Sequence, residues 1–127
     1  MAKLNKKMIL IVEDDEILLR ALYLLFHESK YVIASATDGE AALKMTERLV
    51  PDLVLLDLLL PKMNGFDYLK AMKSNAKLKN IPVVVLSNLG NDEDVDRAKK
   101  LGAEDYFIKS DTDLSVLAEK VEKSLNK

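Results

Sequence analysis

The sequence predicts an α/β fold, an open and doubly wound sheet of five parallel strands with helices on both faces. Five short apolar blocks alternate strictly with five amphipathic stretches that are long enough to be helices. The blocks consist mostly of apolar residues, as parallel strands buried on both faces do. Because crossovers of one hand place helices on alternate sides of a sheet, and five strands are too few for an eight-stranded barrel, we expect a three-layer α/β/α arrangement with five helices.

The first unit begins with Met8–Val12, an aliphatic strand that stops at the acids Glu13, Asp14 and Asp15. From Glu16 to about His27, apolar residues recur at helical spacing, and Arg20 is left for solvent. His27, the only histidine, is expected at the exposed end of this helix and receives no role. The residues expected on the buried face of the helix are Ile17, Ala21, Leu24 and Leu25.

The second and third units repeat this pattern. A proline ends the second helix, because its ring cannot continue a helical backbone, and a loop with proline and glycine follows the third strand. In order, the predicted elements are the strand Tyr31–Ser35, a helix opened by Asp38 and Gly39 and stopped by Pro51, the strand Leu53–Leu56 and a helix from Phe66 to about Ser74. Their expected core residues are Ala42, Met45, Leu49, Phe66, Leu69 and Met72.

The last two units have well-marked helix ends. The stretch from Asp92 to Leu101 has acids in its first turn and lysines in its last, which matches the helix dipole. Gly102 stands where a left-handed cap is favoured, and Asp113 caps the final helix. The two strands are predicted at Pro82–Leu86 and Asp105–Ile108, and the core residues of the final helix at Leu114, Leu117, Val121 and Leu125.

Length and composition limit the possible functions. A chain of 127 residues with 49% hydrophobic residues has the size of one domain, so we expect residues 1–127 to form one unit. Its 19 basic and 21 acidic residues give a net charge of -2, which supplies no basic field for direct nucleic-acid binding. The chain shows no cysteine, signal peptide or membrane-length apolar run, and we expect a cytoplasmic protein without a membrane partner.

Acidic side chains, a hydroxyl and an amine follow the carboxyl ends of different strands. If the first and third strands are neighbours, as in the flavodoxin-like order 2-1-3-4-5, three or more carboxylates converge there and repel one another. A cation relieves such repulsion, and oxygen ligands without His or Cys suit Mg²⁺, so we predict a magnesium site. The residues at this edge are Glu13, Asp14 and Asp15 after the first strand, Asp57 after the third, Ser87 after the fourth and Lys109 after the fifth.

The same residues fit phosphoryl transfer. An ionised aspartate is already a nucleophile, and the remaining difficulty is the negative charge of the incoming group. Mg²⁺ and the Lys109 ammonium can stabilise phosphoryl oxygens, and the Ser87 hydroxyl can donate to another. Taken singly, these residues fit a helix cap, a loop lysine and a turn hydroxyl. Their shared position at one sheet edge is what favours Asp57 as a phosphoacceptor.

These residues resemble the receiver domains of response regulators in two-component signalling, of the stand-alone, chemotaxis-regulator type, over essentially the whole chain. The resemblance implies that Asp14 and Asp57 bind Mg²⁺ directly, joined by the backbone carbonyl of Leu59, and that Glu13 acts mostly through water. Asp15 lies outside the acidic pair and fits a helix cap. The matched features are the pair Glu13 and Asp14, the segment LVLLDLLLPKMNG around Asp57, and Ser87, Tyr106 and Lys109.

The resemblance also implies partners and an output. The phosphoryl donor would be a phosphohistidine on a sensor histidine kinase or phosphotransfer protein, with small acyl phosphates as substitutes. Phosphorylation would draw Ser87 toward Asp57, and Tyr106 would move into the vacated space, changing the surface of Asp92–Leu101, the fifth strand and the final helix. That surface would control a downstream protein that the sequence does not identify. The domain would be a monomer or a weak phosphorylation-dependent dimer, and a self-modifying signalling domain rather than an enzyme.

Three other functions fit parts of the pattern. A phosphatase or phosphotransferase with its nucleophile on the first strand commonly needs a second Asp two positions on, whereas Asp14 is followed by Asp15 and Glu16. A flavin carrier needs a phosphate loop rich in Ser, Thr and Gly where this chain has acids. A receiver that binds proteins without phosphorylation is the third, and the retained Asp57 and Lys109 argue against it.

Three positions depart from the common receiver pattern. Ser110 stands where a proline often follows the lysine and places its ammonium through a cis bond. A cis bond before serine would cost roughly 2.5 to 4 kcal/mol, so the sequence leaves the isomer open. Leu59 is aliphatic and cannot orient an attacking water by hydrogen bonding. Leu60 in place of the frequent methionine conserves volume and should matter little.

Leu59 therefore predicts a comparatively long-lived phosphoaspartate. Replacing Leu59 by Asn should speed dephosphorylation, because the amide can hydrogen-bond a water near the phosphoryl group. The check is the rate at which the phosphorylated protein loses its phosphoryl group. A rate that does not change on this substitution would count against the prediction.

Overall fold

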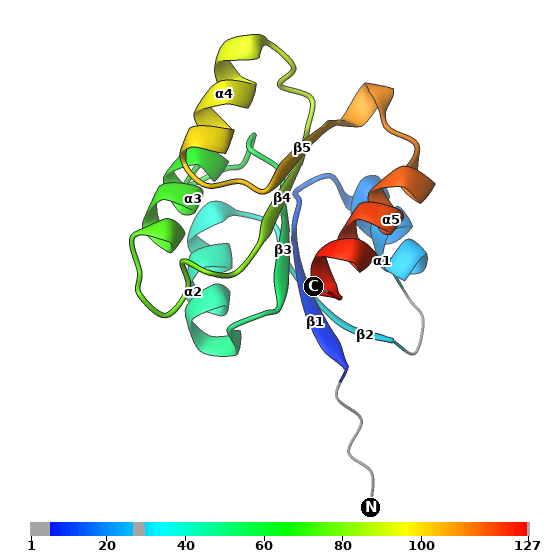
Figure 1. Cartoon of the computed structure of the whole chain (residues 1–127), viewed down its shortest axis with the longest axis horizontal. Coiled ribbons are helices and arrows are strands. Elements are labelled where there is room, and N and C mark those ends of the chain that lie inside the picture. Colours follow the sequence, from blue (N-terminus) through cyan, green and yellow to red (C-terminus); the bar gives the residue numbers. More distant parts are fainter. Residues whose placement is uncertain (1–5, 27–29, 127) are drawn as a thin grey trace, which may run out of the picture.

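The computed structural model describes residues 6–26 and 30–126, whose strands form one parallel sheet in the order β2-β1-β3-β4-β5 (Figure 1). This is the predicted flavodoxin-like order, and β1 and β3 are hydrogen-bonded neighbours. The strands are β1 Lys7–Val12, β2 Tyr31–Ala36, β3 Leu53–Leu56, β4 Val83–Ser87 and β5 Asp105–Ile108. The helices are α1 Glu16–Phe26, α2 Gly39–Leu49, α3 Gly65–Lys73, α4 Asp92–Lys100 and α5 Leu114–Leu125.

Helices cover both faces of the sheet and complete the three predicted layers. In Figure 1, α2, α3 and α4 lie on one side of the strands, and α1 and α5 on the other. Alternate strand residues face opposite layers: Leu10 packs toward the larger helical layer, and Ile9 and Ile11 toward α1 and α5. Every residue of β3 and β4 is buried, which explains why these strands are apolar apart from Ser87 at the end of β4. In the described ranges, no helix is long and apolar enough to span a membrane.

The predicted buried face of α1 is wrong in part. Ile17 is 83% exposed and Leu24 is 75% exposed, whereas Leu22 and Phe26 are buried against the sheet. Of the other two predicted residues, Ala21 and Leu25 are half-buried, and Leu25 packs against the core. The helix has apolar residues on nearly every side, so periodicity alone does not single out one face. The prediction for His27 falls outside the described residues.

Capping residues mark the starts of two helices and the end of a third where the sequence predicts them. The Asp38 carboxylate accepts a hydrogen bond from the Ala41 amide at 2.8 Å and begins α2. The Asp113 carboxylate accepts from the Ser115 amide at 3.0 Å and begins α5. Gly102, directly after the last turn of α4, has a φ of 111°, which glycine adopts without strain. The predicted helix boundaries therefore have a physical cause in the side chains at these positions.

The loop from β3 to α3 lies against the first turn of α2. At Gly39 a Cβ would lie 1.9 Å from the carbonyl oxygen of Met63, so a larger residue requires the loop backbone to move. The Gly39 amide donates to the Pro61 carbonyl at 3.3 Å and holds the loop from the same side. This loop begins with Asp57 and Leu58 directly after β3, so α2 helps to fix the segment beside the strand end.

A buried pair of hydroxyls joins α2 to α3. Thr46 Oγ1 donates to the Ala42 carbonyl at 2.7 Å and also lies 2.7 Å from the Tyr68 hydroxyl. Because threonine has one hydroxyl proton, Tyr68 is the donor in the second bond. Burial raises the pKa of Tyr68 to about 12, so its hydroxyl keeps the proton that it donates. Apolar periodicity did not single out either residue for the core.

The direction of this bond predicts unequal costs for two similar substitutions. Thr46→Val leaves the buried Tyr68 hydroxyl without an acceptor and should cost about 1–3 kcal/mol of unfolding free energy. Tyr68→Phe leaves Thr46 bonded to Ala42 and should cost about 1 kcal/mol or less. Urea denaturation of the two variants measures both costs. A larger loss for Tyr68→Phe than for Thr46→Val would contradict the assigned donor.

Candidate functional site

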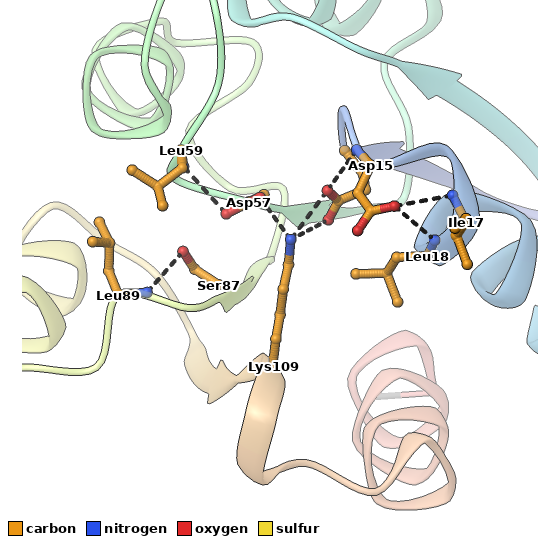
Figure 2. A network of polar contacts seen from close by, with 9 residues as sticks. Asp15, Ile17, Leu18, Asp57, Leu59, Ser87, Leu89 and Lys109 are labelled. Atoms are coloured by element: carbon orange, nitrogen blue, oxygen red, sulfur yellow. Dashed lines mark hydrogen bonds and ion pairs between the residues drawn. The ribbon is translucent and has the colours of Figure 1, made fainter.

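The ends of four strands meet at one edge of the sheet. Glu13 and Asp57 directly follow the paired last residues of β1 and β3. Ser87 is the last residue of β4, and Lys109 begins a single helical turn after β5. Figure 2 shows the side chains of Asp57 and Lys109 pointing toward each other across this edge. The structure thus brings together the strand-end residues that the sequence placed there.

Three carboxylates gather at this edge. One oxygen atom from each of Glu13, Asp14 and Asp57 lies within 4.8 Å of the others. Glu13 is 2% exposed and Asp57 is 4% exposed, whereas Asp14 faces solvent. Hard oxygen donors without nitrogen or sulfur, with one ligand open to water, match the coordination that Mg²⁺ prefers. The donor set present therefore fits the ion that the sequence predicted.

Lys109 places a positive charge inside this acidic cluster. Its Nζ lies 2.8 Å from Asp57 Oδ2 and 3.0 Å from Glu13 Oε1. Burial by itself would lower the pKa of the lysine, but hydrogen bonds to Asp57 and Glu13 and the charges of both acids outweigh it and raise the pKa. The side chain is therefore an ammonium over the whole physiological pH range.

Glu13 is the most constrained of the acids. Burial raises the pKa of its carboxyl above the ordinary value, and the charge of Asp57 adds to this, against the opposing effects of the Asp15 amide and Lys109. The Asp15 amide donates to Glu13 Oε2 at 3.0 Å. The Asp15 carboxylate turns away and accepts from the Ile17 amide at 3.0 Å, which is the helix-capping role expected for it.

The two oxygens of Asp57 have different partners. The Leu59 amide donates to Oδ1 at 3.2 Å, and Lys109 contacts Oδ2 (Figure 2). The Leu59 side chain is 53% exposed, so an aliphatic group borders the site on its solvent side. The carboxylate is therefore oriented from one side by the backbone of the β3–α3 loop and from the other by an ammonium.

Ser87 and Tyr106 meet through the loop after β4. Ser87 is fully buried, and its hydroxyl accepts from the Leu89 amide at 3.3 Å (Figure 2). The Tyr106 hydroxyl donates to the Leu89 carbonyl. Burial and the charges of Asp94 and Asp57 raise the pKa of Tyr106, while a hydrogen bond with Ser87 opposes this rise. Tyr106 therefore does not contact the carboxylates but is linked to the serine beside them.

Two features of Lys109 could not be assigned from sequence. Its peptide bond to Ser110 is trans, because no cis bond occurs in the part of the chain that the structure describes. Its direct contact with Glu13 was also not predicted, because Glu13 was expected only in the metal site. The available signal was electrostatic: a buried acid beside other acids needs a cation nearby, and the lysine is within reach.

Comparison with known proteins identifies the family. The model of the response regulator receiver domain matches residues 9–122. The transcriptional regulatory protein for alkaline phosphatase synthesis, PhoP, from Bacillus subtilis is 37% identical over 108 residues, which are 84% of this chain and 43% of that protein. The chain belongs to the response regulator receiver domain family of two-component signalling, whose members accept phosphoryl groups from histidine kinases or phosphotransfer proteins.

Solved structures agree with this assignment. The chain superposes on the Mn²⁺-bound form of response regulator Rcp1 with a TM-score of 0.79 and 34% identity, covering 92% of this chain and 90% of Rcp1. The phosphorylated cyanobacterial phytochrome response regulator RcpA gives a TM-score of 0.79 with 33% identity, covering 93% of this chain and 90% of RcpA. The chain spans less than half of the length of the most similar curated relatives, from 15% to 44% of each.

The raised pKa of Glu13 predicts a pH dependence of stability. In the metal-free protein, the folded state holds the Glu13 proton more tightly than the unfolded state does. The Glu13 carboxyl therefore stabilises the fold most below about pH 4.5. This contribution is lost as the pH rises through the pKa of Glu13 in the folded state. In Glu13→Gln this loss is absent. The free energy of unfolding of the variant, relative to the unsubstituted protein, should therefore increase from about pH 4.5 to about pH 7.

Urea denaturation in a chelator at several pH values measures this difference. Glu47→Gln is the matched control, because it makes the same change at an exposed helix position. The prediction is contradicted if the free energy of unfolding of Glu13→Gln, relative to the unsubstituted protein, stays constant or falls between about pH 4.5 and about pH 7. The ionised Glu13 carboxylate would then not destabilise the folded state.

Proposed function

We propose that the chain is the phosphoacceptor switch of a two-component phosphorelay, in which Asp57 receives a phosphoryl group from a histidine of a sensor kinase or phosphotransfer protein. The observation that carries this proposal is the 2.8 Å contact between the buried Asp57 carboxylate and Lys109 within a cluster of three carboxylates. A nucleophile and a positive charge for the incoming group thus lie side by side. The similarity of the chain to RcpA, a response regulator solved in its phosphorylated form, supports the proposal.

We infer that this cluster holds Mg²⁺. Asp14, Asp57 and the backbone carbonyl of Leu59 would bind the ion directly, and Glu13 would bind it through water. Bound there, Mg²⁺ supplies positive charge to the oxygens of the transferring group. The Mn²⁺ in the structure of Rcp1 supports a divalent-cation site in this fold. The contact of Glu13 with Lys109 agrees with binding of the ion through water, because the ammonium already occupies one side of the Glu13 carboxylate.

The transfer itself needs little from the protein beyond position and charge. An oxygen of Asp57 forms a bond to phosphorus as the bond from phosphorus to the histidine nitrogen breaks, and the electron pair stays on that nitrogen. Lys109 stabilises the charge on the phosphoryl oxygens at one side of Asp57. The Ser87 hydroxyl can turn its proton toward another oxygen. Residues 1–127 would act in this reaction as one receiver unit.

Intact mass after incubation with acetyl phosphate and Mg²⁺ tests the proposal. We expect a single phosphoryl adduct on the unsubstituted protein, and none in Asp57→Ala or after chelation of the metal, because each removes one required group. Asp96→Ala, an exposed aspartate on α4, is the matched control and should be phosphorylated normally. A folded protein that forms no adduct under any of these conditions would overturn the proposal in favour of a binding module without phosphorylation.

The proposed output surface consists of α4, β5 and α5. Ser87, Leu89 and Tyr106 are linked by hydrogen bonds, so a movement of Ser87 toward a phosphoryl group would break its bond to the Leu89 amide and disturb the residue that Tyr106 contacts. Ala98 is the one buried residue of α4, and Arg97 packs on the Phe66 ring at 4.2 Å. A helix that buries little of its surface can shift at a small free-energy cost. A change at Ser87 could therefore alter the surface that a partner protein contacts.

Tyr106→Ala tests this switch. We expect phosphorylation of Asp57 to proceed, because Tyr106 does not contact the carboxylate, while the response of α4, β5 and α5 weakens. The measurement is the change in backbone NMR signals of these elements on phosphorylation. Tyr23→Ala is the control, because its hydroxyl also donates to a backbone carbonyl, on the opposite layer of helices. An unaltered response in Tyr106→Ala would remove Tyr106 from the mechanism.

A further inference from the structure

The ammonium that contacts Asp57 extends from an exposed turn. Lys109 is the first residue of the helical turn Lys109–Asp111, and this turn has no buried residue. Ser110 and Asp111 are both exposed, and the Lys109–Ser110 bond is trans. A lysine reaches its partners through a flexible four-carbon stem, so the backbone at its base decides where the ammonium can lie. Some other contact has to hold this backbone in place.

Thr112 makes such a contact. Its Oγ1 donates to the Ile108 carbonyl at 2.7 Å, which joins the two sides of the turn. Ile108 is the last residue of β5 and pairs with Ser87 in β4, so its position is set by the sheet. Thr112 is followed by Asp113, the N-cap of α5, whose position is set by the packing of that helix. The bond therefore fastens the turn between two fixed elements, with Lys109 inside it.

We propose that Thr112 is a positioning residue for Lys109, whose hydroxyl holds the turn in the shape that brings the ammonium to Asp57 and Glu13. Threonine suits this task, because its β-branch restricts χ1 and so limits the orientations that the hydroxyl can adopt. In this chain the hydroxyl would restrict the turn where receivers commonly carry a proline after the lysine. The effect on phosphorylation rests on the proposed function, but the effect on the position of Lys109 does not.

Two substitutions separate the hydroxyl from the shape of the side chain. Thr112→Val keeps the β-branch and removes the donor, and Thr112→Ser keeps the donor. With acetyl phosphate and saturating Mg²⁺, we expect Thr112→Val to be phosphorylated about tenfold more slowly, because a displaced ammonium stabilises the transferring group less well. Thr112→Ser should restore most of the rate. Thr37→Val is the matched control, an exposed threonine after the strand at the other edge of the sheet, and should leave the rate unchanged.

A double-mutant cycle distinguishes positioning from a general loss of structure. If Thr112 acts through Lys109, Thr112→Val should have no further effect in the Lys109→Ala background. The carbon NMR signal of Lys109 Cε reports the ion pair without any phosphorylation. It should move toward that of exposed lysines in Thr112→Val and stay in place in Thr112→Ser.

The outcomes separate this inference from the proposed function. An unchanged Cε signal in Thr112→Val overturns the positioning role. An unchanged rate, or an equal loss of rate with and without Lys109, overturns its part in the reaction. A displaced Cε signal in a protein that is never phosphorylated would leave the positioning role standing and reject the phosphoacceptor function instead.

Discussion

Electrostatic repulsion among Glu13, Asp14 and Asp57 is the constraint on which the rest of the site depends. The pairing of β1 with β3 fixes two of these carboxylates side by side, so they cannot separate without breaking the sheet. When all three are ionised, the single charge of Lys109 leaves an excess of two negative charges. A divalent cation matches that excess, and its binding would relieve a repulsion that the sheet imposes.

Fixed and adjustable parts of the site come from different kinds of structure. The strands fix Glu13, Asp57 and Ser87, because each stands at the end of a buried parallel strand. Leu59 and Lys109 come from loops, and each touches a different oxygen of Asp57. Loop backbones need contacts of their own to be as well placed as a strand end. Close packing of α2 against the β3–α3 loop and the hydrogen bond across the turn after β5 provide such contacts.

The sequence predicted what depends on local pattern and missed what depends on tertiary contacts. Strand order and the edge where acids, hydroxyl and lysine meet follow from alternation and strand ends, and both agree with the structure. The buried face of α1 could not be read, because a helix with Ile17 and Leu24 outside and Leu22 and Phe26 inside has no clear periodic stripe. The bond of Lys109 to Glu13 was missed for a similar reason, since only the folded turn decides the reach of a lysine.

The hydroxyl of Ser87 shows how chemistry at Asp57 could reach a distant surface. It accepts a hydrogen bond from the Leu89 amide, so its single proton remains for another acceptor. The Leu89 carbonyl in turn accepts from the Tyr106 hydroxyl, so Leu89 lies between the serine and the tyrosine. A phosphoryl group on Asp57 would be a strong acceptor for the Ser87 proton, since it is charged. A movement of Ser87 toward that group would therefore disturb the Leu89 backbone that Tyr106 contacts, and would connect the charge at the sheet edge to α4 through the loop between β4 and α4.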